Sequence, residues 1–190
     1  MELELGAPSP VDAPLAPTLR SSFDRLASGD SAALEEIYGL LSRELYGLAL
    51  WRTGNASEAE DAVQEVFVRL ADPNLDLRRV RDPRAYLLTM ARRAAVDRLR
   101  SRPRGESLED RVADFLAAPE EDPSLVVDAA AASKWLKRLG EAQREVLFLR
   151  EYAGLSFRRI GAVTGVSTFT AASRHRLAIR KLRKWMGVEK

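Results

Sequence analysis

The chain has 190 residues, of which 46% are apolar, and its 30 basic and 28 acidic side chains leave a formal net charge of +2. The length allows one domain or two small ones, and the absence of cysteine excludes disulfide bonds and thiol catalysis. Because no apolar run can cross a bilayer and the N-terminus lacks the pattern of a signal peptide, the sequence predicts a soluble, cytoplasmic protein.

The chain begins with a segment rich in proline and small residues. We expect residues 1–17 to form a disordered tail. Helical patterns follow over residues 18–28 and 31–53, and the second ends at Gly54 and Asn55, a usual helix stop. Apolar side chains recur on one face of the second helix, which predicts that it belongs to a helical bundle.

The helix expected over residues 57–71 has two opposed faces. Ser57 and Glu60 form a capping box at its start. One face is an apolar stripe of Ala62, Val63, Val66, Phe67 and Leu70. The opposite face carries Asp61, Gln64, Glu65 and Val68. A solvated face usually mixes acids with bases, so two interpretations stay open: the wet side of a core helix, or a docking surface for a partner.

A basic helix is expected over residues 82–102. Asp82 caps it, Pro83 takes its first position, and Pro103 ends it. Besides an apolar core face it has a basic face of Arg92, Arg93, Arg100 and Arg102, and Arg84 and Tyr86 lie at the start of that face. Arginine neutralises phosphate and an aromatic ring can stack an unpaired base, so this face suits a nucleic-acid strand. The alternative is a solvated basic face with Tyr86 in the core.

Residues 104–124 are acidic and are broken by Pro119 and Pro123, which indicates a linker. Further helices are expected over residues 125–139, 141–152, 156–164 and 167–186, and no segment has convincing strand alternation. The sequence therefore predicts an all-α fold, with two helical domains joined by an acidic linker. Two basic blocks around an acidic connector favour two polyanion-binding surfaces.

The last two helices have the spacing of a helix-turn-helix. Ser156 caps the first helix, Gly165 supplies the tight turn, and Ser167 caps the second. A basic second helix can lie in a major groove and present its first turns to base edges, whereas a plain helical hairpin is the alternative. His175 lies on the buried stripe of this helix, and we expect a packed imidazole there rather than a metal ligand.

Three stretches follow one another in a recognisable order, with the acidic linker between the second and the third. They are DAVQEVFVRL from Asp61, DPRAYLLTMARRAAVDRLR from Asp82, and EAQREVLFLREYAGLSFRRIGAVTGVS from Glu141. Each motif alone is moderately specific, but their joint order and spacing are highly specific. Over residues 26–182 the chain resembles the extracytoplasmic-function (ECF) sigma factors of bacterial RNA polymerase.

The resemblance implies a sigma region 2 over residues 18–103 and a sigma region 4 over residues 125–186. It implies that core RNA polymerase is bound by Asp61, Gln64, Glu65, Phe67 and Val68. The basic helix is similar to the one that melts the promoter and reads its minus-ten element, through Arg84, Tyr86, Arg92, Arg93 and Arg100. The helix-turn-helix is similar to the reader of the minus-thirty-five element, with Ser167, Thr168, Phe169, Thr170, Ala172, Ser173, Arg174 and Arg176 in the matching positions.

Several positions depart from the family pattern. The family often has Trp where Tyr86 stands and Asn where Arg93 stands. In the recognition helix, Ala172 and Leu177 replace bases that are common in relatives, and Phe169 replaces a small or polar residue. The fold tolerates these departures, but the identity of the bases read does not follow from them.

The resulting prediction is a sigma factor without catalytic activity, cofactor or metal, whose partners are core RNA polymerase, promoter DNA and, as the family implies, an anti-sigma factor. Two alternatives stay open. One is a helix-turn-helix regulator that binds duplex DNA without polymerase, and the other is a helical interaction protein with no role on DNA. An enzyme is not expected, because no carboxylates cluster with histidine or cysteine at an acid–base or metal site.

Overall fold

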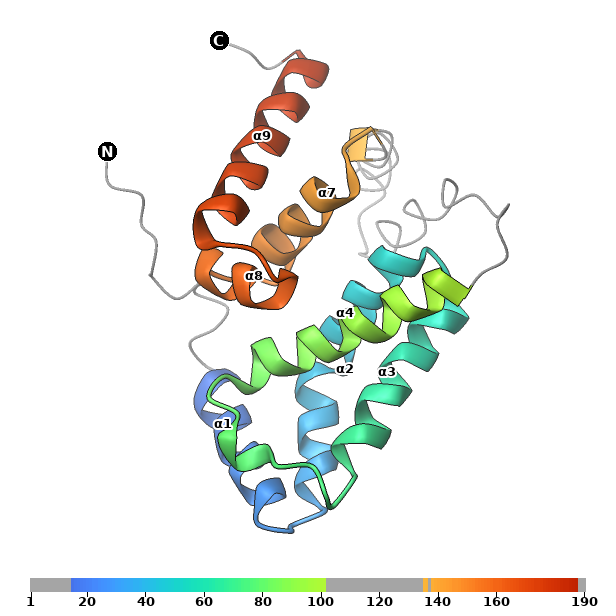
Figure 1. Ribbon diagram of the computed structural model, residues 1–190, viewed down its shortest axis with the longest axis vertical. Coiled ribbons are helices and arrows are strands. Elements are labelled where there is room, and N and C mark those ends of the chain that lie inside the picture. The colour runs from blue at the N-terminus through green and yellow to red at the C-terminus, as the bar shows by residue number, and fades with distance from the viewer. Residues whose placement is uncertain (1–14, 102–134, 137, 188–190) are drawn as a thin grey trace, which may run out of the picture.

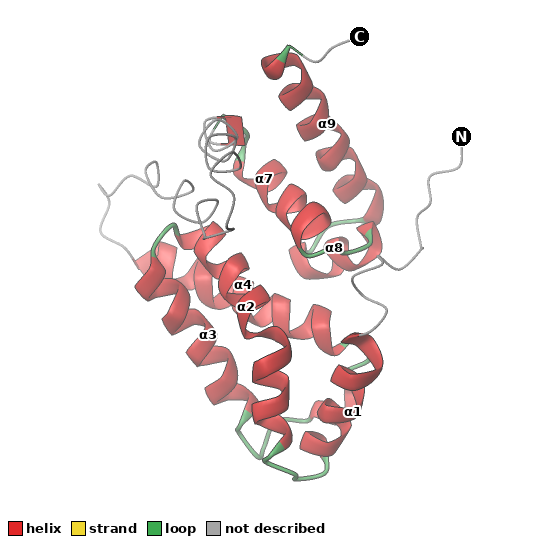
Figure 2. Cartoon of the chain, turned by 180° about the vertical axis from the view of Figure 1, so that it is seen from behind, coloured by secondary structure: helices red, strands yellow, loops and turns green. Residues whose placement is uncertain are grey.

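The computed structural model describes residues 15–101, 135–136 and 138–187, and every regular element in these ranges is a helix (Figures 1 and 2). The predicted all-α fold in two helical units is confirmed. The expected linker over residues 104–124 lies outside the described residues. The helices are α1 Leu15–Ala27, α2 Ala33–Thr53, α3 Ala56–Leu70, η1 Leu77–Arg79, α4 Pro83–Ser101, α7 Glu141–Leu147, η2 Phe148–Tyr152, α8 Phe157–Thr164 and α9 Thr168–Met186.

The N-terminal unit is built around α2, which packs against α1, α3 and α4. Its inward stripe consists of Ile37, Leu41, Leu45 and Leu48, all fully buried. The apolar stripe predicted on α3 is buried against it, and α4 closes the bundle. Gly54 ends α2 with a φ of 61°, a left-handed conformation that glycine adopts without strain.

Two helix starts differ from the expectation. α1 begins at Leu15, so the last residues assigned to the N-terminal tail belong to its first turn. α3 is capped by Asn55, whose side chain accepts a hydrogen bond of 3.3 Å from the backbone N–H of Glu58. The Ser57 capping box is therefore wrong. Asn55 already has an extended backbone, as a cap requires, and Ser57 lies within the helix.

The C-terminal unit contains the predicted helix-turn-helix, α8 and α9. Ser156 caps α8 and Ser167 caps α9, each by accepting a bond from a backbone N–H three residues ahead, at 3.4 and 3.0 Å. Between them Gly165 has a φ of 75°. Before this motif, the helix expected over residues 141–152 is present as α7, continued by the wider π turn of η2.

Gly161 lies within α8 and faces the backbone of the turn that follows the helix. A Cβ at this position would stand 2.7 Å from the backbone oxygen of Val166, which cannot move without opening the turn. Gly161→Ala should therefore lower the free energy of unfolding by about 1–3 kcal/mol in chemical denaturation. The control is Gly39→Ala, in an open part of α2, which should raise it by roughly 0.5–1 kcal/mol. Equal effects at both positions would contradict the tight turn.

The two units are packed against each other. α8 lies on α4, as Figure 1 shows, and one apolar cluster runs through both units without a break. From the C-terminal unit this cluster includes Val146, Phe148, Leu149, Ala153, Leu155, Ile160, Val163 and Ala171. The N-terminal end of α4 is consequently covered by the helix-turn-helix unit.

Candidate functional site

The polar face predicted on α3 divides into an exposed part and a paired part. Asp61 and Gln64 are exposed, and Val68 is 66% exposed. Glu65 instead accepts a hydrogen bond of 2.8 Å from Nη1 of Arg98 on α4. A single exposed apolar side chain is common on protein surfaces, so the docking interpretation depends on the groove that lies beside this face.

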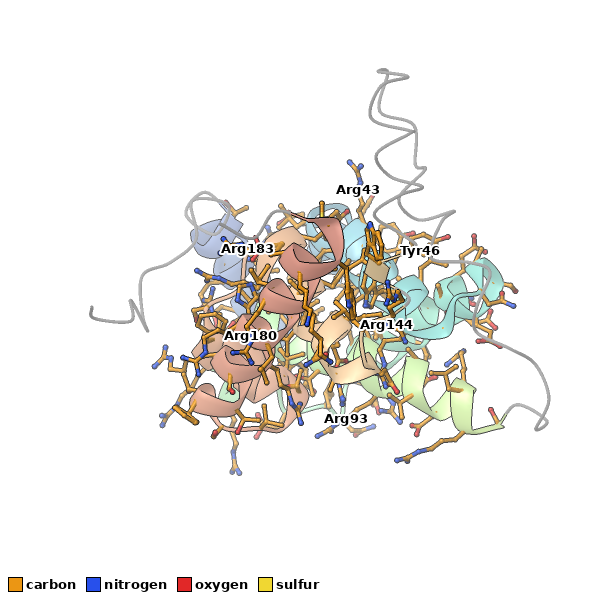
Figure 3. The ribbon with its side chains drawn as sticks, turned by 90° about the horizontal axis from the view of Figure 1, so that it is seen from above. Arg43, Tyr46, Arg93, Arg144, Arg180 and Arg183 are labelled. Carbon is orange, nitrogen blue, oxygen red and sulfur yellow. The ribbon has the colours of Figure 1, made fainter. Side chains whose placement is uncertain are left out.

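A groove runs beside this face, between α2 and α3. Phe67, predicted as a contact residue, is only 9% exposed, because its ring packs against Tyr38 at a centroid distance of 4.9 Å. Phe67 therefore belongs to the floor of the groove and not to its rim. Arg43 of α2 points away from the body of the molecule in Figure 3. The groove is lined by Leu34, Tyr38, Ser42, Arg43, Tyr46, Glu60, Val63, Gln64, Phe67, Val68 and Ala71.

The sequence missed the contribution of α2 to this groove. Tyr38 follows directly after Ile37 of the buried stripe, yet Tyr38 is exposed and Ile37 is fully buried. The only local signal that α2 contributes to the groove is a tyrosine one position away from its buried stripe. The exposed aromatic and Val68 together give the groove an apolar rim.

Arg84 does not lie on an open basic face. It is 6% exposed, and its Nε and Nη2 donate hydrogen bonds of 2.9 and 2.8 Å to the two carboxylate oxygens of Glu44. Nη2 also donates a bond of 2.6 Å to the backbone oxygen of Ala153 in the C-terminal unit. The prediction that Arg84 is available to DNA is wrong for this arrangement, because all of these groups bury it.

Burial perturbs both members of this pair. It raises the pKa of the Glu44 carboxyl, because buried charge loses its hydration, while the positive charge of Arg159 acts in the opposite direction. It lowers the pKa of the Arg84 guanidinium, and the like charge of Arg159 lowers it further. The pair is thus costly to desolvate and depends on its bidentate geometry, so losing either partner would leave an uncompensated charge.

The remaining residues of the basic face of α4 have different environments. Arg92 is half-buried and is bound by Glu145 of α7, whereas Arg93 and Arg100 are exposed. Tyr86 packs edge-on against Phe23 of α1, with ring centroids 6.2 Å apart, and is half-buried. Its environment agrees with the alternative that placed it in the core.

One face of α9 is mostly exposed. Phe169, Ser173, Arg176, Arg180 and Arg183 follow one another at steps of three and four residues and so share this face, and all of them except the half-buried Ser173 are exposed. Phe169, in the first turn, is 74% exposed. Arg180 and Arg183 extend the face along the helix (Figure 3). Neither arginine is among the residues predicted for this site, which end at Arg176.

The other predicted residues of the recognition helix lie at its edges. Ser167 and Thr170 are engaged in the cap, with their hydroxyl oxygens 2.8 Å apart. His175 packs edge-on against Phe157, and its Nε2 lies 2.7 Å from Oε1 of Glu151. Half-buried positions along the helix are occupied by Thr168, Ala172, Ser173 and Arg174.

Among the described residues, no three His, Asp or Glu side chains come close enough together to hold a metal ion. The helices that the structure describes also include none that is both long and apolar enough to span a membrane. Three surfaces are the candidate sites: the α3 face with its groove, the basic face of α4, and the outer face of α9.

Two family models match the chain. The model for Sigma-70 region 2 covers residues 37–105, and the model for Sigma-70 region 4 covers residues 135–184. Region 2 thus corresponds to the bundle of α2, α3 and α4, and region 4 to the unit that contains the helix-turn-helix.

Similar proteins occur among curated sequences and solved structures. The ECF RNA polymerase sigma factor SigK of Mycobacterium bovis is 30% identical over 184 residues, which are 90% of this chain and 97% of that protein. SigK of Mycobacterium ulcerans is 29% identical over 173 residues, 87% and 91% of the two chains. CnrH, solved with the cytosolic domain of CnrY, has a TM-score of 0.65 at 22% identity over 91% of this chain and 99% of that one. RpoE of Bartonella quintana, solved with the anti-sigma factor NepR, has a TM-score of 0.63 at 22% identity, covering 82% and 98%.

Proposed function

The chain belongs to the ECF sigma factors and directs transcription initiation, and we propose that its three surfaces divide this work between polymerase and promoter. In this proposal, α3 and its groove bind core RNA polymerase, α4 binds the minus-ten element, and α9 binds the minus-thirty-five element. The observation that carries it is that the two exposed faces, on α3 and α9, belong to units of one chain that match regions 2 and 4. A regulator acting on duplex DNA alone would need no apolar docking groove, so that alternative is not favoured.

The polymerase surface consists of the exposed part of α3 together with the groove. Asp61, Gln64 and Val68 form its accessible edge, and Tyr38 extends it onto α2. An apolar rim with acids beside it suits a basic or amphipathic helix of the partner. Glu65 takes a secondary part, because Arg98 already neutralises it.

The minus-ten surface consists of the arginines of α4. Arg93 and Arg100 are accessible to phosphates, and Arg92 joins them when the C-terminal unit is elsewhere. Arg84 holds Glu44 and the start of the helix, and so supports this surface without touching the strand. Phosphoryl transfer itself belongs to the polymerase, and the sigma factor contributes binding and positioning alone.

The minus-thirty-five surface is the outer face of α9, with Phe169 at its tip. A phenyl ring in a major groove reads a thymine through the 5-methyl group, whereas the arginines behind it bind phosphate or guanine. Phe169 thus makes thymine the preferred base at one position of the element.

Phe169→Ala should weaken binding of the holoenzyme to its selected promoter by about three- to tenfold, in line with the loss of apolar contact. Replacing the critical thymine by deoxyuridine, which lacks only the methyl group, should cost about fourfold with the parent and almost nothing with the variant. Filter binding with promoters selected from a random library provides the measurement. Equal sensitivity of both proteins to deoxyuridine at every position would contradict this role.

The chain has a further proposed partner, and its regions have proposed limits. CnrH and RpoE were solved with CnrY and NepR, and we propose that an anti-sigma factor likewise regulates this chain in the cytoplasm. Region 2 is taken as residues 18–103, the linker as residues 104–124, and region 4 as residues 125–186.

The proposed division is tested by measuring binding with and without core polymerase. The full chain should co-purify with core enzyme, and promoter DNA should be bound sequence-specifically by the complex and far more weakly by the chain alone. Tight operator-like binding by the free chain, without any affinity for core enzyme, would instead support the duplex-binding regulator.

A further inference from the structure

A small cavity lies where α2, α4 and α7 meet, apart from the groove on α3. Its volume is about 50 Å³, somewhat more than the roughly 30 Å³ that one water molecule occupies in the liquid. Trp51 of α2 and Leu99 of α4 contribute apolar walls, and four charged side chains complete the lining. These charged residues are Arg52, Glu141, Arg144 and Glu145.

The guanidinium of Arg52 has one donor without an acceptor. Its side chain is 8% exposed, and its Nη1 pairs with Glu141 and lies 3.5 Å from Oε1 of Glu145. Its Nε is buried and has no hydrogen-bond partner among the residues that the structure describes. Nη1 and the Nε–H lie on different edges of the planar group, so the two acids that hold Nη1 leave Nε unbound. Because a buried N–H without an acceptor costs free energy, a ligand that accepts from Nε is favoured here.

Arg144 brings a second positive charge to the same cavity. It lies on α7 (Figure 3), is half-buried, and forms no ion pair within the described ranges. A partly buried cation loses hydration, and a nearby anion compensates for that loss. Arg52 and Arg144 thus approach the cavity from two different helices, each with binding capacity left over.

The two glutamates do not neutralise all of the positive charge around the cavity. Glu145 accepts hydrogen bonds of 2.7 and 3.3 Å from Nε and Nη2 of Arg92, and both glutamates pair with Arg52. Together with Arg144, three arginines therefore face two carboxylates. The excess of one positive charge favours an anion over a cation, and a monovalent anion restores neutrality.

We propose that this cavity binds one small monovalent anion, such as chloride, between Arg52 and Arg144. Nε of Arg52 donates a hydrogen bond to the anion, and the charge of Arg144 attracts it from α7. The volume selects the ligand, because a halide ion fits whereas a five-atom oxyanion such as sulfate is too large. Neither arginine belongs to the surfaces proposed for polymerase and promoter, so this site stands apart from the proposed function.

The expected affinity is low, because a ligand of one atom makes few contacts. The best small ligands gain a limited free energy per atom, which for a single atom corresponds to a Kd on the order of 0.1 M. The side chain of Glu141 is 63% exposed, so the anion can exchange with solvent on that side of the cavity. Weak binding with fast exchange is suited to measurement by the linewidth of the chloride nucleus.

Chlorine-35 nuclear magnetic resonance of the full chain provides the first test. Sodium chloride is titrated while sodium gluconate keeps the ionic strength constant, and the excess linewidth should fit one saturable site. Arg144→Gln should weaken that binding by about tenfold, because it removes the charge that attracts the anion. The matched control is Arg158→Gln on α8, which removes an exposed arginine that has no ion pair within the described ranges and should leave the binding unchanged.

The indole of Trp51 tests whether the anion enters the cavity. The chain has three tryptophans, so Trp135→Phe combined with Trp185→Phe leaves Trp51 as the only one. Bromide quenches indole fluorescence through its heavy nucleus, and chloride does not. Bromide bound beside Trp51 should quench saturably, and chloride should relieve this quenching by displacing bromide, whereas sulfate at equal ionic strength should not.

Arg144→Gln is the decisive variant, because Arg144 has no ion pair to lose, whereas a change at Arg52 would strand the buried Glu145. Circular dichroism checks that the variants keep the parent's helicity. If Arg144→Gln loses helicity, the Trp51 measurement decides, since it leaves the lining of the cavity unchanged.

The site is refuted if Arg144→Gln and Arg158→Gln bind chloride equally well, or if sulfate relieves the quenching of Trp51 as strongly as chloride does. A linewidth without any saturable component also overturns it, because a water molecule then satisfies Nε of Arg52 and anions bind only loosely at the surface. A chain that binds chloride as expected but does not bind core polymerase contradicts the proposed function and leaves the anion site standing.

Discussion

Arg84→Ala is expected to lower the free energy of unfolding by about 3–5 kcal/mol, because it leaves the Glu44 carboxylate buried without its partner. It also removes the bond to Ala153 that ties the two units together. Chemical denaturation monitored by circular dichroism provides the measurement. Arg93→Ala, on the exposed side of the same helix, is the control and should change stability by no more than about 0.5 kcal/mol.

Comparing Arg84→Ala with Arg93→Ala distinguishes an arginine that supports the fold from one that reads DNA. Substituting both partners, Glu44→Leu with Arg84→Met, should recover most of the lost stability, since a buried ion pair can be replaced by packed apolar groups. An Arg84→Ala protein as stable as the parent but unable to melt a promoter would restore the role that the sequence assigned to Arg84.

Asp61→Arg combined with Val68→Arg is expected to weaken binding to core polymerase by on the order of 100-fold, because it places two cations on the accessible edge of the proposed docking surface. Both side chains are exposed, so the fold should not change. Glu35→Arg with Ser21→Arg adds the same charge at exposed positions outside the groove and serves as the control. Fluorescence anisotropy of labelled protein titrated with core enzyme measures both. Equal affinity of the two double variants would rule out this face of α3.

Local signals in the sequence were sufficient for most of the fold. Gly54, Asp82, Gly165 and Ser167 each govern the backbone within a few residues, and each ends or begins a helix where the pattern predicted it. The stripe on α3 was likewise readable, since helical periodicity directly determines which side chains share a face.

The features that the sequence did not reveal depend on distant partners. Arg84 is buried by a carboxylate 40 residues away and by a carbonyl 69 residues away, and its own neighbourhood in the sequence shows neither. Glu65 is paired by Arg98, 33 residues further on. A basic or acidic side chain at helical spacing therefore indicates a charged face, but packing between elements decides which of its charges remain available.

The most direct test of this account is run-off transcription from genomic fragments of the source organism, using purified core polymerase with and without the full chain. The account predicts discrete transcripts that appear only when the chain is present and that disappear with the Asp61→Arg, Val68→Arg protein. No specific transcript from any fragment, together with no binding of the chain to core enzyme, would contradict it.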